Sequence, residues 1–201
     1  MNPAFHIIAV SLLTGAFALA VLFFFIRVWA GPNPGPDREA MAKAADFGLL
    51  ASAGVGFVLS LVAIVTGAFI WPWEAVMNSP LVKNKLTIVI IMTLIWGIFL
   101  YLRVRRGTAL WENPILRIYG GLLVVGGFFT NMVANSIGGD IAGSASGFER
   151  VVRLVGIETR FSFYLPTWLI AIIFLLAVAA AIVALVIDRT ATREPEPEAA
   201  Q

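Results

Sequence analysis

Long apolar stretches separated by short polar connections dominate the chain. They fall at about residues 5–29, 47–70, 86–102, 118–137 and 165–187. An α-helix needs about 20 residues to cross the hydrocarbon core of a bilayer, and each stretch is close to that length. None alternates apolar and polar residues as the strands of a membrane barrel do. The pattern therefore predicts an all-α fold, an integral membrane bundle of five transmembrane helices that forms one domain over residues 1–187.

The composition strengthens this prediction. Hydrophobic residues make up 60% of the chain and charged residues 13%, whereas soluble domains average about 45–50% and about 25%. A soluble enzyme is therefore excluded. The chain has no cysteine, which excludes disulfides, iron–sulfur clusters and thiolate metal sites. The net charge of +2 gives no reason to expect a nucleic-acid partner. Residues 188–201 are polar and contain Glu-Pro-Glu-Pro-Glu, which predicts a disordered tail.

Lysine and arginine are unevenly distributed between the two sides of the predicted bundle. Nine of the 14 lie on one side, namely Arg27, Arg38, Lys43, Arg103, Arg105, Arg106, Arg117, Arg189 and Arg193. Because basic residues accumulate on the cytoplasmic side, we expect a multi-pass protein of the cell (cytoplasmic) membrane. Its N-terminus would lie outside and its tail in the cytoplasm. Arg27 and Asp46, at the ends of spans, are expected to reach the membrane interface.

The tryptophans follow the span ends. Only Trp96 lies inside a span, and the others are Trp29, Trp71, Trp73, Trp111 and Trp168. Indole rings settle at the depth of the lipid headgroups, so these five are predicted to be interfacial anchors.

Two segments carry patterns for packing. The second span has a small residue at every fourth position, a stripe formed by Ala44, Gly48, Ser52, Gly56 and Ser60. Such stripes let helix backbones approach closely, and packing inside the bundle is favoured over docking of another subunit. Between the fourth and fifth spans, apolar and charged residues fall on opposite helical faces. The apolar face is Phe148, Val151, Val152 and Val155, and the charged face is Glu149, Arg150 and Arg153. This predicts a short amphipathic interfacial helix, lying on the outer leaflet or against a partner protein.

Groups with catalytic or ligand-binding chemistry are few. The span centres contain no ionisable residue, which disfavours a proton-coupled transporter. His6 is the single histidine, so it supplies no bis-histidine haem site, although Met132 or Met77 would complete a His/Met pair. No His/Asp/Glu cluster has metal-ligand spacing, and no nucleophile–base pair is present, so neither a metal site nor an enzyme is predicted.

Several polar and aromatic residues are nevertheless predicted to meet on the outer side. They are His6, Trp71, Trp73, Asn131 and Asn135, and they would build a cofactor-binding pocket for a haem or a quinone. The segment 71–85 is predicted to be a loop, whose aromatic residues next to Glu74, Asn78, Lys83 and Lys85 would form an outer rim for a quinone head group or a soluble electron carrier. The alternatives are an ordinary interfacial turn, with Ser79-Pro80 starting the next helix, and amides that bond between helices.

The stretch from Gly54 to Gly139 carries a series of short motifs. They are Thr66-Gly67 to Trp71-Pro72, then Ser79-Pro80, Asn84-Lys85, Trp96, Tyr101 to Arg103, and Gly138-Gly139. This stretch resembles the bacterial multi-pass membrane proteins of the domain of unknown function 2231 type. The resemblance implies a small multi-pass membrane protein of four helices and no settled activity. Members carry more histidine near the first span than the one found here, which puts a metal or haem role in doubt.

Three functions are compatible with these patterns. The leading hypothesis is a non-catalytic accessory or scaffold subunit of a larger respiratory or photosynthetic membrane complex, with membrane lipids and other integral membrane subunits as partners. The second is a haem- or quinone-binding membrane redox protein that takes part in electron transport. The third is a permease for a small neutral solute. A lipid, quinone or pigment held by packing alone leaves no trace in a sequence.

Overall fold

The computed structural model describes residues 3–70, 72–143, 146–154 and 156, together with Ile172, Leu175, Val178, Ala179 and Ile182. Within these residues the helices are α1 (Pro3–Ala30), α2 (Pro36–Ile70), α3 (Trp73–Asn78), α4 (Pro80–Arg106), α5 (Ala109–Glu112), α6 (Pro114–Ile141) and α7 (Gly147–Leu154). No strand occurs in this part of the chain, so the all-α prediction is confirmed for it.

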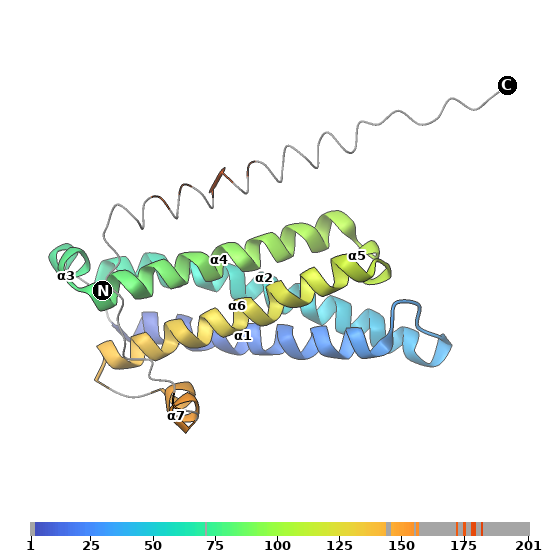
Figure 1. Cartoon of the computed structure of the whole chain (residues 1–201), viewed down its shortest axis with the longest axis horizontal. Helices are drawn as coiled ribbons and strands as arrows, with labels where there is room; N and C mark the ends of the chain where they lie inside the picture. Colours follow the sequence, from blue (N-terminus) through green and yellow to red (C-terminus); the bar gives the residue numbers. More distant parts are fainter. Residues whose placement is uncertain are drawn as a thin grey trace. The chain divides into compact units, whose positions relative to one another are not determined.

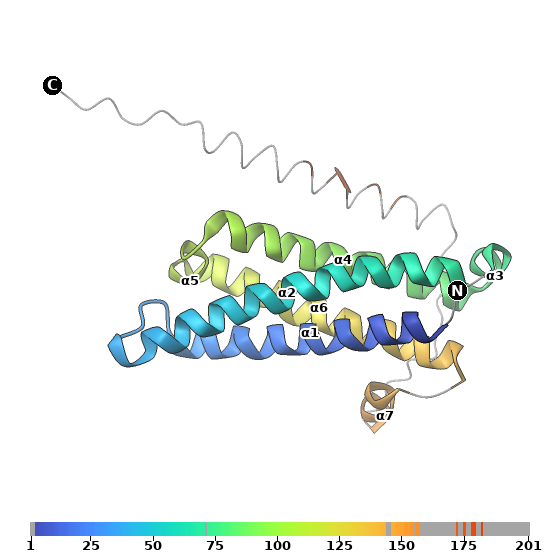
Figure 2. The same cartoon turned by 180° about the vertical axis from the view of Figure 1, so that it is seen from behind.

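Four of these helices, α1, α2, α4 and α6, are long and apolar enough to cross a membrane, which fits a multi-pass membrane protein. They run side by side, with α1 packed along α2 and α4 along α6 (Figure 1). The connection between α1 and α2 lies at the same end as α5, and we call this the α5 end. Helices α3 and α7 lie at the opposite end, together with the start of α1, and we call this the α3 end (Figure 2). The predicted span 165–187 and the tail 188–201 lie outside the described residues, apart from the five single helical positions.

The helices extend beyond the apolar stretches that predicted them. α2 begins at Pro36 rather than near residue 47, and α4 at Pro80 rather than near residue 86. Backbone hydrogen bonds hold a helix together whether or not its side chains are apolar, so a helix continues past the hydrocarbon core. Ser79 caps α4, because its hydroxyl accepts the backbone N–H of Val82 and Pro80 follows in the first turn. The predicted helix start at Ser79-Pro80 is confirmed.

A stacked pair of aromatic rings lies at the centre of the bundle. The rings of Phe17 on α1 and Trp96 on α4 are parallel, with centroids 4.2 Å apart, and neither ring is exposed. Gly56 of α2 lies against Phe17, and Gly127 of α6 lies against Trp96. A Cβ added to Gly127 would lie 2.8 Å from Trp96 Nε1, and one added to Gly56 would overlap the Phe17 ring. Both glycines are therefore needed for the aromatic rings to fit between the helices.

The small-residue stripe of α2 lies mostly against helices of the same chain. Gly48 and Gly56 face the rings of Phe23 and Phe17 on α1. At the other end of the stripe, the Ser60 hydroxyl accepts a hydrogen bond from Thr93 of α4, at 3.2 Å. Ser52 is half-buried and Ala44 is exposed. Most of the stripe thus brings α2 close to α1 and α4.

The helix expected between the fourth and fifth spans forms as α7, but its most buried residue is not apolar. Glu149, predicted on the charged outer face, is fully buried, and its carboxylate forms an ion pair with Arg153 at 2.5 Å. Phe148 packs edge-on against Phe129 of α6. Val152 is half-buried and Val151 is exposed, whereas Val155 lies outside the described residues. An interfacial position for α7 stays a prediction.

Candidate functional site

A cavity of about 180 Å³ lies at the α3 end of the four long helices. Its walls are mostly aliphatic, with Val10, Leu13, Ala63, Val89, Met92 and Ala134 among them. Four hydrogen-bonding side chains lie in the cavity wall, namely His6, Lys85, Asn131 and Asn135, and the indole N–H of Trp73 adds a donor at the rim. An apolar cavity of about 150 Å³ holds one benzene molecule, so this cavity has room for about one ring.

The imidazole of His6 is held by the end of α2. Its Nδ1 lies 3.1 Å from Thr66 Oγ1, and that hydroxyl donates its own proton to the carbonyl of Val62, at 2.8 Å. With the Thr66 hydroxyl donating to its own helix, its oxygen can accept from Nδ1–H, and in that tautomer Nε2 of the neutral ring has a lone pair. Gly67 lies next to the ring, and a Cβ there would be 3.2 Å from His6 Cε1. In this tautomer the site offers Nε2 as a hydrogen-bond acceptor.

Lys85 supplies the cation of the cavity. Its ammonium lies close to α6, since a Cβ added to Gly138 would be 3.0 Å from Nζ. No acidic side chain of the described residues pairs with it. The prediction that Lys85 lies on a loop is wrong, because α4 begins at Pro80 and includes it. The missed signal is helical spacing, since Lys85, Val89 and Met92 follow one face of α4 and all line the cavity.

The two asparagines of α6 share one partner. Nδ2 of Asn135 donates to Thr14 Oγ1 at 2.8 Å, and Nδ2 of Asn131 donates to the same oxygen at 3.3 Å. Thr14 in turn donates to the carbonyl of Val10. An amide has two N–H groups and one carbonyl oxygen. Each asparagine therefore keeps hydrogen-bonding capacity beyond its bond to Thr14.

The predicted pocket residues His6, Trp73, Asn131 and Asn135 thus line one cavity. Trp73 is 73% exposed and forms part of its rim, whereas Trp71 lies outside the described residues. The methionine in the cavity wall is Met92. Met132 is half-buried elsewhere on α6, and the side chain of Met77 is not among those described.

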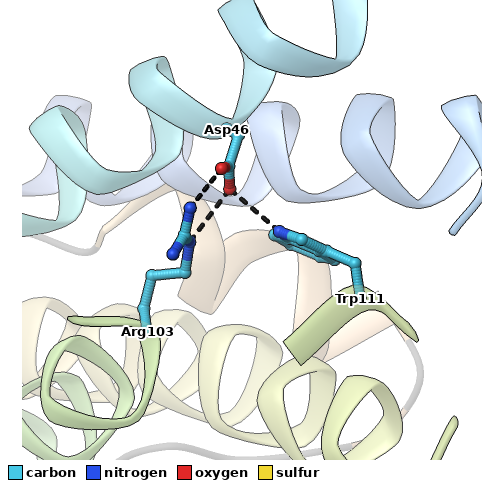
Figure 3. Close-up of polar contacts among 3 residues, drawn as sticks. All are labelled: Asp46, Arg103 and Trp111. Atoms are coloured by element: carbon cyan, nitrogen blue, oxygen red, sulfur yellow. Dashed lines mark hydrogen bonds and ion pairs between the residues drawn. The ribbon is translucent and has the colours of Figure 1, made fainter. Parts of the chain in front are cut away.

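The α5 end carries a second polar group, around Asp46 (Figure 3). Arg103 of α4 forms a two-point ion pair with the Asp46 carboxylate, and Trp111 Nε1 donates to Oδ1 at 3.0 Å. Arg27 of α1 lies over the Trp111 ring, with Cζ 4.7 Å from the ring centroid. Trp111 is 1% exposed and Arg27 6%, so both side chains pack inside the protein at this end, and their position at the membrane interface stays a prediction. Their partners lie far away in sequence, and a span pattern contains no information about such pairs.

In the described part of the chain, no three His, Cys, Asp or Glu residues are grouped to hold a metal ion. The fold and the cavity define a class, a helical protein of the membrane-spanning type with a mostly apolar cavity about the size of one ring. Comparison of the chain with family models, with curated proteins and with solved structures finds no match. The resemblance to the domain of unknown function 2231 stays a prediction.

Proposed function

We propose that this protein binds the head group of a quinone, or of a molecule with the same chemistry, within the membrane. The observation that carries this proposal is the ring-sized cavity with aliphatic walls and four hydrogen-bonding side chains. A quinone head group is a flat ring with two carbonyl oxygens that accept hydrogen bonds. Pockets for such molecules are mainly apolar, with a few polar groups that fix orientation.

The polar groups of the cavity suit both redox forms of a quinone. Lys85 only donates hydrogen bonds, so it binds a carbonyl oxygen of the oxidised form. His6 Nε2 accepts, so it binds a hydroxyl of the quinol and is placed to take its proton. The Asn131 and Asn135 amides serve either form. The alternative of a haem receives less support, because a porphyrin has four pyrrole rings and the cavity has room for about one ring.

We propose further that the chain serves as a non-catalytic accessory subunit of a respiratory or photosynthetic membrane complex. A bound quinone exchanges electrons with a redox partner. Other integral membrane subunits of the complex would provide this redox partner. The third hypothesis, a permease, receives no support from the cavity, since Phe17, Trp96 and Phe99 fill the bundle beyond it. The distribution of basic residues favours a cytoplasmic location for the α5 end, where Arg27, Arg103 and Arg117 lie.

The test is quinone binding by the purified protein. The protein is purified from native membranes in mild detergent. The absorption spectrum, the co-purifying proteins and any extractable quinone are determined from the same chromatographic peak. Protein in nanodiscs is then titrated with decylubiquinone and menadione, with empty nanodiscs as the partition blank. We expect saturable binding above the blank. Lys85→Met should weaken it about tenfold, as expected for loss of a charged hydrogen bond.

A pair of variants checks the location of the ligand. Ala134→Leu fills part of the cavity, whereas Ala51→Leu adds the same side chain at an exposed position of α2. Only Ala134→Leu should reduce binding. Circular dichroism should show that both variants are folded. Uptake equal to that of empty nanodiscs, or equal loss in both variants, would overturn the proposed quinone site.

A further inference from the structure

Arg27 is a buried cation with no carboxylate partner of its own. It lies one turn before the end of α1 and is 6% exposed. One face of its guanidinium lies on the Trp111 ring, and Nη1 donates to the backbone carbonyl of Gly31. Both partners are neutral. Burying a charge is unfavourable unless an opposite charge compensates it.

The surrounding charges do not provide this compensation. Arg27 is close enough to feel the charges of Asp46, Arg103 and Arg117. The Asp46 carboxylate already takes the two-point pair with Arg103 and the Trp111 N–H. Arg117 is half-buried, and its Nη1 donates to the backbone carbonyl of Trp111, at 3.3 Å. Among the described residues, Glu112 is exposed and pairs with none of these arginines.

Three guanidinium groups thus lie near one another with one carboxylate among them, and these four residues carry two excess positive charges. They lie at the end of four helices that are long and apolar enough to cross a membrane, where lipid phosphates are expected. Guanidinium groups bind phosphate oxygens with paired N–H groups and are more weakly hydrated than ammonium groups. Basic pockets between transmembrane helices are typical sites for anionic headgroups.

We propose that Arg27, which lies on the Trp111 ring, and Arg117, which bonds to the Trp111 carbonyl, bind the phosphate of an anionic phospholipid at the α5 end. The half-buried Arg117 contacts the phosphate directly, while the buried Arg27 supplies the uncompensated charge. A zwitterionic lipid fits less well because its choline carries a positive charge of its own. This site is separate from the cavity and does not depend on the quinone.

The test is lipid binding measured by native mass spectrometry. Detergent-purified protein is titrated with phosphatidylglycerol and with phosphatidylcholine, which gives the ratio of their dissociation constants. We expect a clear preference for phosphatidylglycerol in the wild type. Arg117→Gln should reduce this preference about fivefold, the size typical of one basic residue at an anionic surface. Arg117→Lys keeps the charge and should retain most of it.

Arg106→Gln is the matched control, since Arg106 is an exposed cation at the same end. It should leave the preference unchanged. Equal affinity of the wild type for both lipids overturns the proposal without the use of any variant, and an equal loss in Arg106→Gln and Arg117→Gln overturns it too. Titration with inorganic phosphate tests whether the bound phosphate group belongs to a lipid or is free phosphate. Displacement of phosphatidylglycerol by millimolar phosphate would overturn a lipid as the ligand, and retention of the lipid supports it.

Discussion

Arg103 and Asp46, 57 positions apart in sequence, join α4 to α2 through two hydrogen bonds, one of them 2.9 Å from Nε to Oδ1. Their side chains are only 12% and 19% exposed. The same carboxylate accepts the Trp111 N–H from α5. One carboxylate therefore connects α2, α4 and α5 at the α5 end. We expect its loss to lower the stability of the fold.

Asp46→Leu should lower the free energy of unfolding by about 3 kcal/mol, because it leaves the Arg103 guanidinium largely buried without its anion. The measurement is unfolding of the detergent-solubilised protein, followed by circular dichroism. The double variant Asp46→Leu with Arg103→Leu removes both charges and should recover at least half of the loss. A double variant no more stable than Asp46→Leu would show that the pair is not the source of the effect.

Gly56→Ala should destabilise the bundle by about 1–3 kcal/mol, because the added methyl group overlaps the Phe17 ring. Gly54→Ala, two residues earlier on the same helix, is the matched control. A Cβ at Gly54 meets nothing within 4 Å, so this change should be neutral or stabilising through helix propensity. Denaturant unfolding of both variants in one detergent gives the comparison, and similar midpoints would contradict the packing around Phe17.

Thr14→Val should cost about 1–2 kcal/mol, since the loss of one hydroxyl removes the acceptor shared by the Asn131 and Asn135 amides. Thr130→Val has the same shape change but removes a hydroxyl that bonds only to the carbonyls of Gly126 and Gly127 in its own helix. Thermal unfolding should therefore separate the two variants. Equal costs would mean that the amides find other partners when Thr14 is lost.

Thr66→Val should change the tautomer of His6. In the wild type we expect the hydrogen on Nδ1, and without the Thr66 acceptor this preference should fall. Nitrogen-15 spectra measure this directly, because His6 is the single histidine. Quinone affinity should fall about fivefold, the typical size of one net hydrogen bond. The control is Thr87→Val, because the Thr87 hydroxyl donates to the backbone carbonyl of Lys83 in its own helix. This change should affect neither the His6 tautomer nor the quinone affinity.

Much of the arrangement at the α3 end follows from the span pattern. In an antiparallel bundle, the start of the first span and the end of the fourth lie at the same end. The pattern therefore predicts that His6, Asn131 and Asn135 lie close together, as the structure places them. What they bind stays a prediction. Lys85 was predicted on a loop instead of a helix because hydropathy marks only the apolar centre of a helix, and the polar first turns of α4 look like a loop.

The α5 end was harder to predict, for a different reason. The charge of Arg27 suggests an exposed position, but its side chain is buried against the Trp111 ring, whose N–H bonds to the Asp46 carboxylate. These three residues come from α1, α5 and α2, and nothing in their local sequence shows that they meet. The burial of Glu149 on α7 was equally hard to predict. The helical pattern shows on which face of the helix Glu149 lies, but it does not show what packs against that face.

The central cluster of Gly56, Phe17, Trp96 and Gly127 has a consequence for how this protein can evolve. Each of the four long helices contributes one of these residues, and the two aromatic rings fill the space that the two glycines leave. A larger residue at either glycine fits only if an aromatic ring is replaced by a smaller side chain. Among descendants of this sequence, these four positions should therefore change together, through paired substitutions that keep the sum of their side-chain sizes constant.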